Sequence, residues 1–323
     1  MTMAALPILA VIVFMLSLTL GASEASIIEA LRSLFQGDCS GTDFKIIFYI
    51  RLPRVLAALL GGAALSVSGV IIQGVLNNPM AAPNIIGVNS GAGFFVILVM
   101  ALMPTLTGYL PLAAFLGALF ASLIIYAIST ATGSGRVTVI LVGAAMGSIL
   151  TACINTVKSL FPDSVYDVSG FLIGGLAAAD LGKVLPAAIM IVPTLIIVYL
   201  MSGGLDVLSL GTEVASSLGM RVKRARFVYL ALASVLAGAA VSFGGLIGFV
   251  GLLVPHIMRR LVGNTHKVLI PAAALGGGVF LLVADTISRT AFAPYELPVG
   301  ILMSLVGGPF FIFLIFAERR RGE

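Results

Sequence analysis

The chain has 323 residues, of which 60% are hydrophobic and only 10% are charged. Soluble proteins carry about 25% charged residues, so this composition excludes a soluble globular domain, a disordered chain and a coiled coil. The net charge is +5, and no run of Lys or Arg is long enough to form a phosphate-binding stripe for nucleic acid. A membrane span needs roughly 20 apolar residues, and a chain of this length can supply about ten of them.

The first apolar run, residues 3–22, predicts a retained membrane span. A signal peptide is the alternative, but the run lacks a basic start and is long for a signal sequence. Residues 23–50 read as a solvated loop with one short amphipathic helix. Four further apolar runs follow, separated by turns rich in Gly, Pro and Asn: 51–76, 85–103, 110–132 and 137–160.

The second half of the chain holds one piece that is too short to cross a membrane, residues 168–179, which we expect at the interface or packed against the bundle. A span over 184–202 follows. The uncharged stretch 227–256 is too long for one crossing and is rich in glycine near Gly244 and Gly245. It predicts two short crossings, with one long tilted span as the alternative. Runs at 268–288 and 299–317 complete ten.

The distribution of Lys and Arg residues indicates which side of the membrane each loop occupies. With the N-terminus in the cytoplasm and ten alternating spans, most of the 18 Lys and Arg residues fall on the cytoplasmic side. Ten spans also place the basic clusters around Arg226 and Arg259 on that same side, which one long span would not. The sequence therefore predicts an all-α membrane protein, a polytopic bundle of about ten transmembrane helices with both termini cytoplasmic.

Catalytic and metal-binding patterns are missing from the sequence. It has no paired Cys and His ligands, no nucleophile motif and no P-loop, so we expect no catalytic residue, no metal and no bound cofactor, and any ATPase is a separate polypeptide. Gln73 and Asn155 lie in apolar runs, where interhelical hydrogen bonding is the usual role. Asp285 and Arg289 are four residues apart and can pair along one helix.

The polar and basic loop 203–226 contains a short amphipathic helix, predicted from Ser209 to Met220. Leu210, Val214 and Leu218 recur at intervals of four and form an apolar stripe. Such a stripe must be buried against lipid, against the protein itself or against a partner, and the periodicity does not choose among them.

Four stretches together resemble the permease family of ATP-binding-cassette importers for iron-siderophore, haem and cobalamin. They occur in family order and span roughly residues 50–315. The stretches are Arg51-Leu52-Pro53-Arg54 with Gly61-Gly62-Ala63-Ala64-Leu65 and Gly69; Gln73 with Asn78-Pro79-Met80-Ala81, Pro83, Gly87 and Gly91; Gly245-Leu246-Ile247-Gly248-Phe249-Val250-Gly251-Leu252 with Pro255-His256; and Ala284-Asp285, Arg289, Glu296-Leu297-Pro298-Val299-Gly300 and Gly307-Gly308-Pro309.

The resemblance implies the type II ABC importer permease fold as a single domain over residues 1–323. It implies a second permease subunit, identical or paralogous, and two cytoplasmic ABC ATPase subunits that hold ATP and Mg. It also implies an external binding protein that delivers the cargo across a bacterial or archaeal cytoplasmic (inner) membrane. The cargo expected from the family is an iron-siderophore or related metal chelate, with haem or cobalamin as the alternative.

The resemblance also assigns roles to particular residues. Three arginines match those that pair with glutamates of the binding protein, with headgroup snorkelling as the alternative: Arg51, Arg54 and Arg289. The ATPase-coupling element, two short helices around a glycine, corresponds to Leu210, Gly211, Glu213, Val214, Ala215, Leu218 and Gly219. The cytoplasmic gate and the pathway lining correspond to Asn78, Met80, Gly133, Ser134, Gly135, Gly143, Gly147, Thr151 and Asn155.

Two rival functions make different predictions from the sequence. An ion-coupled secondary carrier needs a titratable residue at mid-membrane depth, and the map places none there. An intramembrane enzyme needs a paired nucleophile and base, which the sequence also lacks. Alternating access driven by a partner ATPase is therefore the mechanism we expect.

Overall fold

The structure is a computed structural model that describes residues 2–21, 25–36, 41–83, 87–131, 136–162 and 168–322. Within these ranges the regular structure is entirely helical. The elements are α1 (Thr2–Thr19), α2 (Ile27–Gln36), α3 (Thr42–Lys45), η1 (Ile46–Arg51), α4 (Leu52–Val75), α5 (Val88–Leu102), η2 (Thr107–Tyr109), α6 (Leu110–Ala131), α7 (Arg136–Leu160), α8 (Val168–Ile173), α9 (Leu181–Leu200), α10 (Ser202–Ser209), α11 (Thr212–Ser217), α12 (Val222–Gly244), α13 (Val250–Val262), α14 (His266–Thr290) and α15 (Val299–Gly322).

Each of the ten predicted apolar runs forms a helix, in the predicted order. Six helical segments of the described chain are long and apolar enough to cross a membrane: Thr42–Val75, Leu110–Ile128, Leu141–Leu160, Leu181–Leu200, Val222–Gly244 and His266–Thr290. Three more apolar helices are shorter: Ala5–Thr19, Val88–Leu102 and Val299–Leu314. The tenth, α13, has 13 residues.

The uncharged stretch 227–256 is divided into two helices, as predicted. Helix α12 ends at Gly244 and α13 begins at Val250, so one long tilted span is wrong. The prediction that both halves are short holds for α13 alone, because α12 has 23 residues. The chain reverses through Gly245 at φ 68°, where a Cβ would overlap the backbone of Phe171. Only glycine fits this corner.

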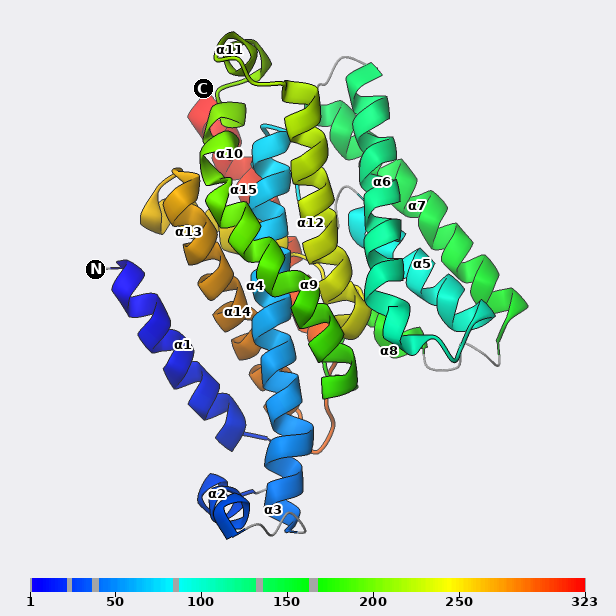
Figure 1. Cartoon of the computed structure of the whole chain (residues 1–323), viewed down its shortest axis with the longest axis vertical. Helices are drawn as coiled ribbons and strands as arrows, with labels where there is room; N and C mark the ends of the chain where they lie inside the picture. Colours follow the sequence, from blue (N-terminus) through cyan, green and yellow to red (C-terminus); the bar gives the residue numbers. More distant parts are fainter. Residues whose placement is uncertain are drawn as a thin grey trace.

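Helix α4 lies at the centre of the bundle, between α12 and α14 (Figure 1). Its small residues bring backbones together: a Cβ on Gly62 would overlap the backbone of Gly277 in α14, and a Cβ on Gly69 would overlap the backbone of Gly251 in α13. Small residues allow such close packing where lipid supplies no hydrophobic drive for helix association. Nearly all of α4 from Gly61 onward is buried.

The short apolar piece predicted to pack against the bundle does so. Its helix, α8, has six residues and is followed by an irregular segment that contains a turn. The Leu246 amide donates to the Phe171 carbonyl at 2.9 Å, and the Gly300 amide donates to the Gly174 carbonyl at 2.9 Å. The piece therefore joins the turn after α12 to the start of α15.

The two ends of the bundle carry different short helices. Figure 1 shows α2 and α3 at one end, beyond the starts of α4 and α9, and α11 at the opposite end beside the start of α12. Helix α2 is the short amphipathic helix predicted within residues 23–50. Helix α10 packs on α4 and α14 and leads directly into α11.

Candidate functional site

The arginine cluster lies at the end of the bundle that carries α2 and α3. It consists of Arg51, Arg54 and Arg289 with the acids Asp285 and Glu296. The Nε of Arg54 donates to both carboxylate oxygens of Asp285, at 3.1 and 3.0 Å, and its Nη1 donates to Glu296 Oε2 at 2.6 Å. Asp285 is completely buried, whereas the Glu296 side chain is 38% exposed.

The other two arginines bind the C-terminal end of α1. Nη1 of Arg51 donates to the carbonyls of Leu18 and Thr19, at 2.7 and 2.8 Å. Nη2 of Arg289 donates to the Ser17 hydroxyl at 2.5 Å and also contacts the Ser17 carbonyl. The predicted Asp285–Arg289 pairing is confirmed, with 3.8 Å between Asp285 Oδ2 and Arg289 Nε.

The three arginines that the resemblance assigns to docking are buried in this chain and do not lie exposed at its rim. Each is between 3 and 6% exposed. The physical reason is that the last turn of a helix leaves carbonyls without intrahelical donors, and buried guanidinium groups need acceptors. Docking by these residues is not tested by this geometry and stays a prediction.

Sequence reasoning missed Glu296 and Ser17 as partners of this cluster. Glu296 was noticed only within a motif, and Ser17 only as part of an apolar run. Arg54 and Glu296 are 242 positions apart, and Ser17 and Arg289 are 272 apart. No periodicity connects positions at such separations, so only the packed fold reveals these pairs.

The coupling element has the form of two short helices around a glycine that the resemblance implies, and the single helix predicted from Ser209 to Met220 is wrong, because Gly211 interrupts it. Gly211, at φ 101°, separates α10 from α11, and Gly219, at φ 81°, follows the end of α11 as the predicted stop. Ala215 is fully buried, whereas Glu213 is exposed. Leu210, Val214 and Leu218 are 59%, 46% and 64% exposed, so their stripe is not buried against the protein itself.

The pathway candidates on α7 line an open groove of about 520 Å³ together with Ser90 of α5. Thr151 and Asn155 are exposed there. Within the described residues Asn155 makes no hydrogen bond, so the expectation of an interhelical bond is wrong for it. The groove is formed by small or neutral polar side chains, namely Ser90, Gly143, Ala144, Gly147, Ser148, Thr151, Ala152 and Asn155.

The gate candidates Asn78 and Met80 lie in the turn after α4. The Asn78 side-chain oxygen accepts the Met80 amide at 3.0 Å, which fixes the turn. Gln73, one turn earlier, bonds across helices as predicted: its Nε2 donates to the Gly251 carbonyl at 3.3 Å. The other gate candidates, Gly133, Ser134 and Gly135, lie outside the described residues.

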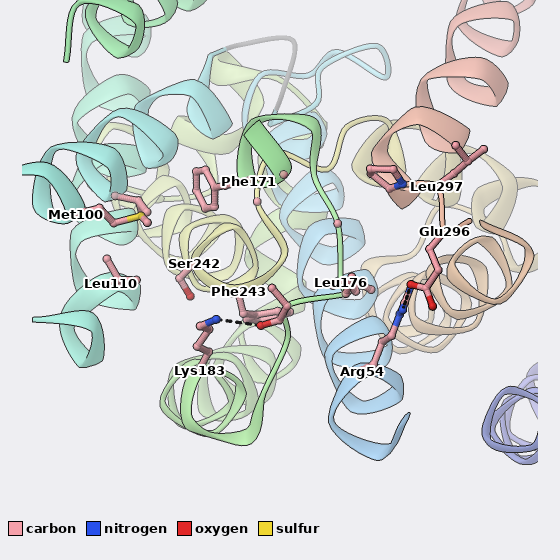
Figure 2. Close-up of a pocket in the computed structure, with 17 residues that line it drawn as sticks. Arg54, Met100, Leu110, Phe171, Leu176, Lys183, Ser242, Phe243, Glu296 and Leu297 are labelled. Atoms are coloured by element: carbon pink, nitrogen blue, oxygen red, sulfur yellow. Dashed lines mark hydrogen bonds and ion pairs between the residues drawn. The ribbon is translucent and has the colours of Figure 1, made fainter. Parts of the chain in front are cut away.

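A mostly apolar cavity of about 290 Å³ adjoins the arginine cluster and was not predicted from the sequence. Figure 2 shows the Arg54–Glu296 pair on one side, with Phe171 and Met100 on the other. Elsewhere in the described ranges, no group of three or more His, Cys, Asp or Glu residues is placed to hold a metal ion.

Comparisons with known proteins agree along most of the chain. The model of the FecCD transport family matches residues 9–317. The chain is 38% identical to the hemin transport system permease protein HmuU of Yersinia pestis, over 96% of this chain and 95% of that protein. It is 37% identical to the Fe(3+)-citrate import system permease protein YfmD of Bacillus subtilis, over 95% and 93%. A solved inward-facing metal-chelate type ABC transporter is 28% identical, with a TM-score of 0.80 over 97% of each chain.

Proposed function

Because this chain belongs to the FecCD transport family, we propose that it is the membrane-spanning subunit of an ATP-driven importer for an iron-siderophore complex. The observation that carries the proposal is the family match over residues 9–317. The chain is a multi-pass membrane permease, and the family role is transport rather than catalysis. ATP hydrolysis is assigned to a separate subunit.

The proposed cargo is a metal chelate, with a ferric siderophore first and haem or cobalamin as the alternative. Relatives named for hemin and for Fe(3+)-citrate support this class. The groove on α7 supports it as well, because Gly147 and its small neighbours leave room for a bulky ligand. Neutral Thr151 and Asn155 offer hydrogen bonds without the strong binding that a buried charge would impose.

The proposed assembly has two permease subunits, two cytoplasmic ATPases and an external binding protein. The exposure of Leu210, Val214 and Leu218 supports an ATPase contact, since three exposed apolar side chains in and beside α11 favour a partner over water. ATP and Mg bind to the ATPases, and this chain holds no cofactor. The second permease is a copy of this chain or a paralogue.

The proposed location is a bacterial or archaeal cytoplasmic (inner) membrane, with α11 and both chain termini on the cytoplasmic side. The arginine cluster then faces the outside. We assign Arg51, Arg54 and Arg289 to the docking region, where a carboxylate of the binding protein approaches through the partly exposed Arg54–Glu296 pair. Attraction between complementary charges there speeds the encounter between the permease and the binding protein and sets their relative orientation.

The proposed mechanism is alternating access. ATP closes the two ATPases together, α11 moves with them, and the bundle opens the pathway to one side and then the other. The chain provides no covalent chemistry. Its contribution is a difference in contacts between the two states, which sets their populations.

The experiment that tests the proposal is the intact mass of the tagged chain, extracted from its own membranes in mild detergent. We expect two permease copies with two ATPase copies, and a co-purifying binding protein leads to the cargo. A lone chain or a simple homodimer without an ATPase, reproducible across detergents, would contradict the proposal and favour an ion-coupled carrier.

A further inference from the structure

A second, polar cavity lies at the opposite end of the bundle from the arginine cluster. It has a volume of about 310 Å³ and lies where the end of α4, the end of α10 and the turn between α13 and α14 meet. The residues that matter for its chemistry are Gln73, Asn78, Ser209, Arg259, Asn264 and His266. Asn78 is also a gate candidate, but no role assigned above uses the cavity itself.

Arg259 enters this cavity as a cation without a counter-ion. It is partly buried, and its Nη1 donates to the neutral amide oxygen of Gln73. Among the described residues no carboxylate lies within ion-pair distance of it. A partly buried guanidinium is costly unless an anion compensates it, which distinguishes Arg259 from Arg54 with its two acids.

Asn78 supplies a second, independent observation. Asn78 is only 3% exposed, and its Nδ2 has no hydrogen-bond partner in the described structure. Its Oδ1 is already occupied by the Met80 amide. An amide N–H that is buried without an acceptor costs free energy comparable to a lost hydrogen bond, so the site lacks an acceptor as well as a negative charge.

Asp206 of α10 contacts a residue of the cavity lining, His266, which occupies one of its carboxylate oxygens. Its Oδ1 accepts the His266 backbone amide at 3.0 Å and lies 2.6 Å from His266 Nδ1. No carboxylate belongs to the cavity lining itself. The lining therefore offers a guanidinium, side-chain amides and the Ser209 hydroxyl, which together suit a tetrahedral oxyanion.

We propose that this cavity binds a phosphate group. Its lining carries the cation of Arg259 and no carboxylate, so the local field attracts anions. The phosphate comes either from an anionic phospholipid headgroup or from free phosphate, which share this chemistry. A bound phosphate joins α4 and α13 to the base of α10, the helix that leads to α11.

The test measures the melting temperature of the full-length chain in detergent, with inorganic phosphate titrated against chloride at equal ionic strength. Arg259→Gln removes the central cation, and Arg260→Gln is the matched control, the same change at the exposed neighbour. We expect phosphate to stabilise the wild type and R260Q alike. R259Q should need at least about tenfold more phosphate to reach the same rise in melting temperature, as expected for the loss of a charge-assisted contact.

A second variant tests the proposal even if R259Q does not fold. Asn264→Asp adds a negative charge at an exposed lining position without changing side-chain size. It should weaken the phosphate effect several-fold while leaving the melting temperature in chloride unchanged. Equal phosphate responses of the wild type, R259Q and N264D would overturn the proposal.

Nanodiscs distinguish the two sources of phosphate. If phosphatidylglycerol stabilises the wild type over phosphatidylcholine and inorganic phosphate then adds nothing, the site takes a lipid headgroup. If inorganic phosphate still acts in phosphatidylglycerol discs, the site takes free phosphate. If R259Q instead weakens co-purification of the ATPase and leaves the phosphate response intact, a protein carboxylate fills the cavity and the proposal is wrong. None of these readouts depends on transport or on cargo.

Discussion

Arg54 of α4 and Asp285 of α14 form a buried ion pair in which a single nitrogen, Arg54 Nε, reaches both carboxylate oxygens at 3.1 and 3.0 Å. Arg289 approaches the same carboxylate at 3.8 Å. Asp285 is thus the one fully buried acid in a cluster of three described arginines, and it joins two central helices of the bundle.

Replacing Asp285 with Asn should destabilise the chain by about 3–5 kcal/mol, because it leaves the buried Arg289 without a carboxylate and the buried Arg54 with only the partly exposed Glu296. The matched control is Asp180→Asn, since Asp180 pairs with Lys183 at 3.2 Å but both side chains are about half exposed. That change should cost under about 1 kcal/mol. Thermal unfolding in detergent measures both, and equal losses would contradict the structural role assigned to Asp285.

Replacing Glu213 with Arg should reduce the ATP hydrolysis that the loaded binding protein stimulates, by about tenfold, because it reverses a charge on the proposed ATPase contact. Docking of the binding protein should be unchanged. Glu29→Arg on α2, the same change at the other end of the bundle, should leave hydrolysis as it is. If E213R abolishes docking and spares hydrolysis, α11 is not the coupling element.

Replacing Glu296 with Gln should strengthen binding-protein docking several-fold at low salt, because Glu296 competes with the partner's carboxylate for Arg54. The gain should shrink as salt is raised past about 0.15 M, where exposed charges are screened. Titration of the binding protein at two salt concentrations measures this. An affinity unaffected by E296Q would show that the partner does not reach Arg54.

Replacing Gly147 with Phe should block transport without unfolding the chain. A Cβ there meets only the Ser90 hydroxyl oxygen, at 3.9 Å, so the ring projects into the groove instead of overlapping a neighbour. Gly108→Phe is the control, since Gly108 is also open but does not line the groove. Uptake in vesicles, with melting temperature alongside, separates the two effects. Normal uptake by G147F would place the pathway elsewhere.

Local signals in the sequence account for most of the helices. Apolar runs located each span, and the glycines at 244 and 245 marked the reversal between α12 and α13. The spacing of Leu210, Val214 and Leu218 indicated an apolar stripe, and the structure shows that all three side chains are exposed. These features were predictable because each depends on neighbours within a few turns.

The environment of the charged residues was not predictable in the same way. The sequence gives the depth of Arg51 and Arg289 along a span, but not that the end of α1 folds over them to supply its carbonyls. The lack of a counter-ion at Arg259 is likewise a property of which helices meet there. Such facts depend on packing between segments that lie from about 30 to more than 250 positions apart in the sequence.

The contact between Gly62 and Gly277 has a mechanical consequence for transport. Sliding α4 along α14 by one residue, about 1.5 Å, would bring a side chain against the opposing backbone, where even a Cβ does not fit. This close contact therefore opposes sliding of the two helices along each other. The Gly69–Gly251 contact adds α13 to the same tightly packed group. In the proposed alternating-access mechanism, we therefore expect α4, α13 and α14 to move together as the pathway opens.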